Sequence, residues 1–269
     1  LKDLKFRTNF NIDYIAMKED EFMPSILDYR EGYNTGATRS TTNLTWGNES
    51  YFTYNKSVND VHNFGAVLGM SFQNWRYDRT GLDGMYFPSD DIRTLNAASV
   101  ISNQGVNVGS EHAMLSYFGR MTYNYMSKYM LELNMRSDGS SRFGRQKRFG
   151  YFPSASVGWR FVDEEPIQSL GWLSDGKLRF SVGSTGNEAI GDYTSQGEFT
   201  LGTNYLDFSG AAPTVMPNAS LTWETTTQYN LGLELGFVNN RILLTTDYYL
   251  KKTRDLLYNV PIPNTTGFE

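Results

Sequence analysis

The strongest constraint on the fold of this chain is a period-two alternation of apolar and polar residues that recurs along most of its length. Between Leu4 and Ala16 the even positions read Leu, Phe, Thr, Phe, Ile, Tyr and Ala, whereas the odd positions from Asp3 to Ile15 are nearly all polar or charged. Successive side chains of a β-strand point to opposite faces, so this pattern predicts a strand with one apolar and one hydrated face. No segment shows a convincing helical period, although residues 164–174 have room for a short helical turn. The sequence therefore predicts an all-β chain.

Nine strands are expected from this pattern, of which seven alternate cleanly and two, 42–56 and 241–254, alternate less cleanly. Several of them run to about 14 residues, whereas strands of globular sheets are typically about 5–6 residues long and a tilted strand crosses a bilayer in about 9–11. The expected spans are 3–17, 42–56, 62–76, 111–126, 129–138, 153–162, 176–185, 224–237 and 241–254.

The connections between these strands alternate in length. The shorter ones are 57–61, 127–128, 163–175 and 238–240, and the longer ones are 18–41, 77–110, 139–152 and 186–223. In an up-and-down antiparallel sheet, alternate connections lie at the same end. One end of the predicted sheet therefore has short connections and the other has large loops. This is the arrangement of outer-membrane barrels, which have short periplasmic turns and long extracellular loops.

The alternation alone does not say whether the apolar face meets lipid or a protein core. The polar face carries charges of both signs, such as Arg120 and Glu132, which suit a hydrated lumen. Aromatic residues gather beside the shorter connections, among them Tyr123, Tyr125 and Tyr129, where they would form the aromatic girdle of a membrane interface. These features favour an antiparallel transmembrane β-barrel. A soluble secreted β-sheet module for binding or adhesion is the alternative.

Composition excludes several other classes of protein. The longest apolar stretch of the 269 residues is Phe64–Met70, too short for a transmembrane helix, which needs about 18 residues or more. Disorder is excluded because aromatic residues make up 15% of the chain. The formal net charge of −5 argues against nucleic acid as a partner, because phosphate binding requires a concentrated basic face.

A search for catalytic or metal-binding residues finds little. The chain has no cysteine and two histidines, His62 and His112, neither of which has a metal-ligating neighbour at a suitable spacing. Adjacent acidic residues in a loop, such as Asp90 and Asp91, are usually solvated. The composition of the serine-rich segment 137–141 is typical first of all of a turn. We therefore expect no enzyme, no cofactor and no metal site.

Six blocks of residues in the later part of the chain are informative when taken together: RSDGSSRFG (136–144), FPSASVGWR (152–160), KLRFSVGSTGN (177–187), PNASLTWETTTQ (217–228), DYYLKKTRDLL (247–257) and TTGF (265–268). These blocks resemble the SusC/RagA-like TonB-dependent outer-membrane transporters of Bacteroidetes. From about residue 113 onward the chain follows that family's later barrel in order and spacing, whereas residues 1–112 match it more loosely.

The resemblance implies a 22-stranded barrel closed by an N-terminal plug, of which residues 1–269 would be a partial transmembrane β-barrel domain of about nine strands. The plug and the TonB-contacting segment would then be absent from this chain, which we expect to be part of a longer polypeptide. The implied function is nutrient import across the cell outer membrane, with a glycan or an oligopeptide as cargo. The implied partners are a SusD-like surface lipoprotein, the TonB complex through the missing N-terminal part, and outer-membrane lipid.

Ligand or lipoprotein contacts are expected in the two longest connections, where aromatic faces suit sugar rings and charged groups suit hydroxyls or peptide termini. The candidates are Tyr77, Tyr86, Phe87, Asp90 and Asp91 in 77–110, and Tyr205 and Phe208 in 186–223. The alternative is that these side chains pack the loops against one another. Arg136, Asp138 and Arg142 are expected to brace the connection 139–152 rather than to contact cargo.

Overall fold

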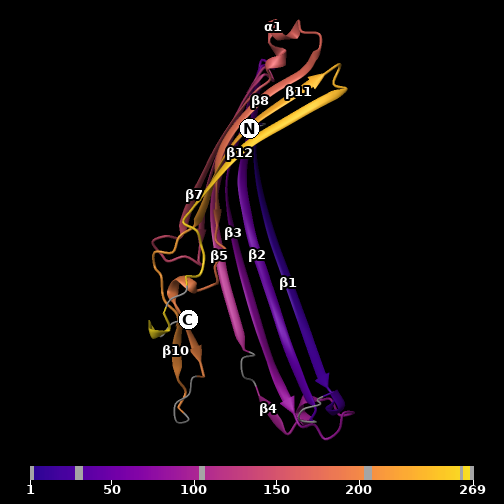
Figure 1. The fold of residues 1–269 in the computed structure, drawn as a ribbon, viewed down its shortest axis with the longest axis vertical. Helices are drawn as coiled ribbons and strands as arrows, with labels where there is room; N and C mark the ends of the chain where they lie inside the picture. Colours follow the sequence, from indigo (N-terminus) through magenta and orange to yellow (C-terminus); the bar gives the residue numbers. More distant parts are fainter. Residues whose placement is uncertain (1–2, 28–32, 103–106, 203–207, 261–262, 267–269) are drawn as a thin grey trace. The chain divides into compact units, whose positions relative to one another are not determined.

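The computed structural model describes residues 3–27, 33–102, 107–202, 208–260 and 263–266, and within them the regular secondary structure is almost entirely β-strand (Figure 1). The only α-helix in these ranges is α1 (Glu165–Gln168), which supplies the helical turn expected in 164–174. Short 3₁₀ turns lie at Ser25–Leu27, Leu95–Ala97, Phe161–Asp163, Thr194–Gln196 and Asn264–Thr266. The strands are β1 (Leu4–Met23), β2 (Thr35–Val58), β3 (His62–Met85), β4 (Val100–Ser102), β5 (Val108–Tyr125), β6 (Tyr129–Ser140), β7 (Phe149–Trp159), β8 (Leu173–Asn187), β9 (Glu198–Leu201), β10 (Ala211–Val215), β11 (Glu224–Phe237) and β12 (Ile242–Arg254).

The long strands form one sheet in the order β1-β2-β3-β5-β6-β7-β8-β11-β12, with β4 paired to β3, and β9 and β10 form a separate hairpin. Apart from the short β4, β9 and β10, strands that follow one another along the chain are neighbours in the sheet, which is the up-and-down order that the alternating connections predict. Among the described residues, the sheet does not close into a complete barrel. The chain divides into two compact units: unit 1 comprises 1–9, 48–72 and 114–269, and unit 2 comprises 10–47 and 73–113.

All nine expected strands are present, but their boundaries and number needed correction. β2 begins at Thr35 and β3 continues to Met85, so the outer parts of the connections expected at 18–41 and 77–110 are strand. β6 continues beyond its expected end at residue 138 to Ser140, so most of the segment 137–141, interpreted as a turn, is strand that pairs with β5 and β7. The three strands β4, β9 and β10 were not predicted, because three to five residues contain too few alternations to detect.

In unit 1, the register of the sheet aligns the apolar positions of six strands into one row. Each member of this row faces the next across a strand pair, and the row is Tyr123, Leu131, Val157, Phe180, Leu231 and Tyr248. No described part of the chain covers it: Val157 is 50% exposed and Tyr248 68% exposed. An uncovered apolar surface that continues over six strands is a surface built for contact with lipid or protein.

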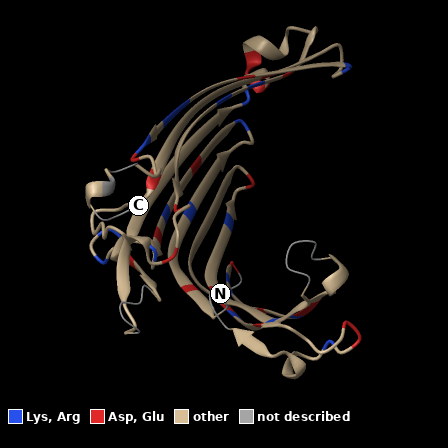
Figure 2. Cartoon of the chain, turned by 60° about the horizontal axis from the view of Figure 1, so that its bottom comes forward, with Lys and Arg blue, Asp and Glu red and all other residues tan. Residues whose placement is uncertain are grey.

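The opposite face of the same strands is polar. The neighbouring row of cross-strand partners reads Thr122, Glu132, Ser156, Ser181, Asn230 and Tyr249. Arg120 pairs with Glu132 at 2.8 Å, and Arg179 pairs with Glu234 at 2.9 Å and with Asp247 at 3.2 Å. Figure 2 shows that basic residues, in blue, and acidic residues, in red, occur along the strands of the sheet. The two faces of unit 1 are therefore built for different environments, one apolar and one aqueous.

The shorter connections gather at one end of unit 1. The Met126 N–H donates to the Val61 carbonyl at 2.8 Å, and the Arg160 N–H donates to the Lys128 carbonyl at 2.8 Å. In the tight turns Asn59-Asp60 and Met126-Ser127 all four residues have positive φ, as in the type I′ turns that suit twisted hairpins. This turn conformation lets two residues connect adjacent strands.

Aromatic rings pack against one another beside these turns, as the sequence predicts. Phe64 stacks on Tyr123 at 4.9 Å, and Tyr125 stacks on Tyr129 at 6.1 Å. Tyr129 and Trp159 both donate hydrogen bonds to one oxygen of Glu164, at 2.7 and 3.3 Å. These side chains have an apolar body and a polar tip that is hydrogen-bonded at the sheet end, which is the arrangement of an interfacial girdle. No helix in the described part of the chain is long and apolar enough to cross a membrane.

Candidate functional site

In unit 2, a buried asparagine ties two of the long connections together. Asn34 is 5% exposed. Its amide donates to the Phe87 carbonyl at 3.2 Å and to Asp90 Oδ1 at 3.0 Å, and its Oδ1 accepts the Phe87 N–H at 2.6 Å. The backbone N–H and the hydroxyl of Ser25 donate to the same Asp90 carboxylate at 3.0 and 2.9 Å. The connection that follows β1 is therefore held to the segment that follows β3.

The ring of Phe87 completes this cluster. It is 6% exposed and packs edge-to-face on Phe22 with 5.3 Å between ring centroids. A Cβ atom at Gly36 would lie 2.8 Å from the ring tip, so a glycine is needed there for the ring to pack. The neighbouring Tyr86 adopts a left-handed backbone conformation, with φ 61°, and its ring packs on Tyr33 at 4.8 Å.

The candidate contact residues fall into two groups by exposure. Tyr86 is 48% exposed, Asp91 is exposed and Phe208 is 77% exposed, so these three side chains are open to a ligand or partner. Phe87 and Asp90 are used in the cluster around Asn34, and Tyr77 is half-buried within β3 rather than in a loop. Tyr205 lies outside the described residues. Their role in ligand contact stays a prediction.

The hydrogen bonds to Asp90 predict an acid-sensitive cluster. Donation from the Ser25 backbone N–H and then from the Asn34 amide lowers the pKa of the Asp90 carboxyl. A carboxyl with a lowered pKa stabilises the folded state above its unfolded-state pKa, and this stabilisation is lost as the pH falls through the folded-state pKa. We expect the amides of Ser25 and Phe87 to become less protected from hydrogen exchange only below about pH 4, near the ordinary aspartate pKa. Asp90→Asn does not ionise, and a variant that still showed the acid-induced loss would contradict this assignment.

Unit 2 also contains a stacked pair of rings and two ion pairs that join different strands. Trp75 of β3 stacks on His112 of β5, with 4.6 Å between ring centroids. Arg39 pairs with Asp83 at 2.8 Å, and Arg79 pairs with Glu19 at 3.4 Å. The sequence pattern shows only that His112 has no metal-ligating neighbour at a suitable spacing. The register of β3 with β5 places it beside Trp75, which is a long-range relation that no local pattern contains.

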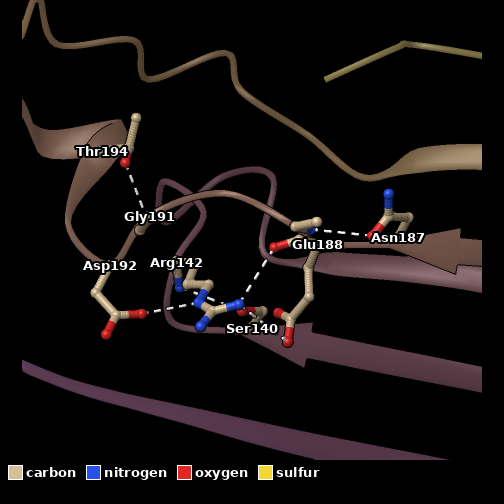
Figure 3. A network of polar contacts seen from close by, with 8 residues as sticks. Ser140, Arg142, Asn187, Glu188, Gly191, Asp192 and Thr194 are labelled. Atoms are coloured by element: carbon tan, nitrogen blue, oxygen red, sulfur yellow. Dashed lines mark hydrogen bonds and ion pairs between the residues drawn. The ribbon is translucent and has the colours of Figure 1, made fainter. Parts of the chain in front are cut away.

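In unit 1, Arg142 connects two long connections (Figure 3). Its Nε donates to Asp192 Oδ1 at 2.8 Å, and its Nη1 donates to the Glu188 carbonyl at 3.4 Å. Its backbone N–H donates to the Ser140 hydroxyl at 3.2 Å. The arginine therefore fastens the segment after β6 to the segment after β8. Arg136 similarly pairs with the buried Asp138 at 2.7 Å and donates to Ser116 at 3.1 Å.

An aromatic cluster supports the same connections. Phe143 is 1% exposed, Trp223 5% and Phe152 7%. The Trp223 ring lies 5.1 Å from the Phe143 ring and 5.4 Å from the Phe152 ring, and its indole N–H donates to the Arg148 carbonyl at 2.8 Å. This cluster is a local core that fixes the long connections of unit 1 on the sheet.

Residues 3–269 match the protein family described as TonB dependent receptor-like, beta-barrel. The chain belongs to this TonB-dependent receptor β-barrel family. A relative from Formosa agariphila, TonB-dependent receptor P39, is 38% identical over 98% of this chain and 26% of its own length. SusC of Bacteroides thetaiotaomicron, a TonB-dependent receptor, is 34% identical over 88% of this chain and 24% of its own length. This receptor segment thus spans about a quarter of the curated relatives that it matches.

Solved structures agree with this assignment. The structure of the RagAB peptide transporter matches the whole receptor segment with a TM-score of 0.89 and 28% sequence identity, covering 30% of that chain. A structure of the RagAB peptide importer in an "open-open" state matches with a TM-score of 0.88. The fold of this receptor segment is therefore the all-β, TonB-dependent barrel fold predicted from the sequence.

Within the residues that the structure describes, no three histidine, aspartate or glutamate side chains of the receptor segment are grouped so that they could hold a metal ion. Its relatives are named as receptors and transporters rather than as enzymes. What the arrangement supplies is a wall with one apolar face, one charged face and braced connections.

Proposed function

We propose that this chain is part of the barrel wall of an outer-membrane importer that takes up a glycan or an oligopeptide. The observation that carries this proposal is the row from Tyr123 to Tyr248, an apolar surface uncovered over six strands, backed by a polar row with ion pairs. A soluble sheet would bury such a row, whereas a barrel wall in lipid exposes it. The names of the relatives, TonB-dependent receptor and peptide transporter, support the same function.

In this proposal the importer uses energy from the TonB complex and works with a SusD-like surface lipoprotein. The apolar face of unit 1 meets outer-membrane lipid, and the face that carries Arg120 and Arg179 lines the lumen. The long connections, which Arg142 and Asn34 brace, present exposed side chains such as Tyr86 to the lipoprotein or cargo. Stacked rings such as Trp75 on His112 suit sugar rings, and charged side chains such as those of Arg39 and Asp83 suit peptide termini.

An uptake experiment on the full-length receptor tests the proposal. Cells that depend on a defined oligopeptide mixture or on a defined glycan for growth are compared with and without the receptor gene. We expect growth on one of the two nutrient classes to be lost without the receptor and to be lost equally without TonB. Unchanged growth on both, or a full-length receptor that stays monomeric and folded in buffer without detergent, would instead favour a soluble binding module.

Co-purification tests the partner. A tagged full-length receptor in mild detergent should retain a surface lipoprotein. Tyr86→Ala should lower the yield of co-purified lipoprotein if the connection after β3 contacts the lipoprotein. Tyr151→Ala is the control and should leave the yield unchanged, because Tyr151 is also exposed, at 64%, but lies on β7. Equal yields from both variants would remove Tyr86 from the proposed contact.

A further inference from the structure

The apolar face of unit 1 is hollowed between β2 and β6. One hollow, of about 510 Å³, and a second, of about 590 Å³, share four lining residues and so form one continuous groove. The shared residues are Tyr54, Ala66, Met121 and Leu133. Almost all of the surface that lines the groove is apolar. This groove lies on the face that, in the proposed function, meets lipid.

Small residues explain the groove. Ala66 of β3 and Gly119 of β5 occupy outward positions whose neighbours along the same strands are Leu68 and Met121. A Cβ atom at Gly119 would lie 3.8 Å from the nearest atoms, Leu68 Cδ1 and the Val67 carbonyl oxygen. That is ordinary van der Waals contact, so the backbone does not require glycine here. The missing side chains leave the space open.

The groove has the length of one lipid chain. On β2 it runs from Val58 to Phe52, and six residues of strand span about 20 Å. Half of the hydrocarbon core of a bilayer is about 15 Å thick, and barrel strands are tilted within it, so this length corresponds to one leaflet. Val58 lies next to the short connection 59–61, which places that end of the groove at the girdle.

A pair of opposite charges lies at the end of the groove that is nearest to the aromatic girdle. Lys56 lines the groove, and its Nζ lies 3.4 Å from Asp3 Oδ2, with both side chains nearly half exposed. Such a pair presents a cation and an anion side by side. This arrangement complements a zwitterionic head group, which carries a phosphate and an ammonium, better than it complements a purely anionic one.

We propose that this groove binds one phosphatidylethanolamine molecule of the periplasmic leaflet. One acyl chain lies in the groove over Ala66 and Gly119, the phosphate contacts Lys56, and the ethanolamine ammonium contacts Asp3. The proposal rests on the proposed function, because it requires the apolar face to lie in the outer membrane with the short connections on the periplasmic side.

Native mass spectrometry of the detergent-purified full-length receptor tests this site, with equal amounts of dioleoyl phosphatidylethanolamine and dioleoyl phosphatidylglycerol as probes. We expect one phosphatidylethanolamine adduct on the wild type. Gly119→Leu fills the groove and should lower the adduct about tenfold, the loss expected when a few methylene groups lose their burial. Ala155→Leu adds the same side chain to the same face outside the groove and should leave the adduct unchanged. Lys56→Gln should remove the preference for phosphatidylethanolamine.

The possible outcomes distinguish a failure of the lipid site from a failure of the proposed importer function. Equal adducts on Gly119→Leu and Ala155→Leu, or a wild-type preference for phosphatidylglycerol, would overturn the site while leaving the importer intact. A wild type that binds neither lipid and remains folded without detergent would overturn both the lipid site and the placement in the membrane.

Discussion

Replacing Leu68 with arginine is expected to lower the free energy of unfolding of the full-length receptor in phospholipid vesicles by about 2–4 kcal/mol, the cost of an arginine on the lipid face of a barrel near mid-depth. Leu68 is 68% exposed on the apolar face of β3. On the surface of a soluble protein, a substitution at so exposed a position usually changes stability by within about 0.5 kcal/mol. The two environments therefore predict clearly different results for the same variant.

Ser156→Arg is the matched control. Ser156 lies on β7 in the polar row, directly opposite Glu132, so an arginine there enters water beside a carboxylate. Its effect should be near zero, as measured by reversible urea unfolding in the same vesicles. A Leu68→Arg variant as stable as the wild type would place the face of β3 in water or against protein, and would contradict the barrel orientation.

Replacing Trp223 with alanine is expected to destabilise the long connections of unit 1 by about 3–5 kcal/mol, the usual cost of truncating a buried large aromatic residue. Trp223 is 5% exposed, packs on Phe143 and Phe152, and donates to the Arg148 carbonyl. Truncation leaves a cavity in the small local core and removes this hydrogen bond. The effect is local, because the barrel strands are held by their own ladders.

Hydrogen exchange measures this local opening. The amides of Lys147 and Leu221, which donate within the turns of these connections, should lose protection in Trp223→Ala, while amides in the middle of β6 should not. Trp172→Ala is the control, because Trp172 is 58% exposed and its main ring contact is a stack on Phe237. That variant should cost about 1 kcal/mol or less, the value of one exposed aromatic pair. Comparable exchange in both variants would show that the cluster does not fix the connections.

The sheet was largely predictable from the sequence, because the side chains of a strand alternate and the alternation survives in the residue pattern. β6 and β11, for example, begin within a residue of their expected positions. The three short strands and the extension of β3 to Met85 were not predictable, since their pairing depends on partners distant in the chain rather than on their own residues.

The candidate site was predicted less well. The expectation that Arg142 braces the connection 139–152 agrees with its ion pair to Asp192, whereas Arg136 and Asp138 pair with each other within β6. The residue pattern did not distinguish Asp91, which is exposed, from Asp90, which accepts hydrogen bonds from Ser25 and Asn34. Two adjacent aspartates have the same local sequence context. They differ in the structure because hydrogen-bond donors from distant segments reach Asp90.

The sequence by itself determined the two faces of the wall and the alternation of its connections, because both follow from the local order of residues. The tertiary structure decided what those residues meet. It aligned Leu131, Val157 and Phe180 into a continuous apolar row, set Trp75 on His112, and left a groove above Gly119. These relations depend on strand register, and register is fixed by pairing between segments far apart in the chain.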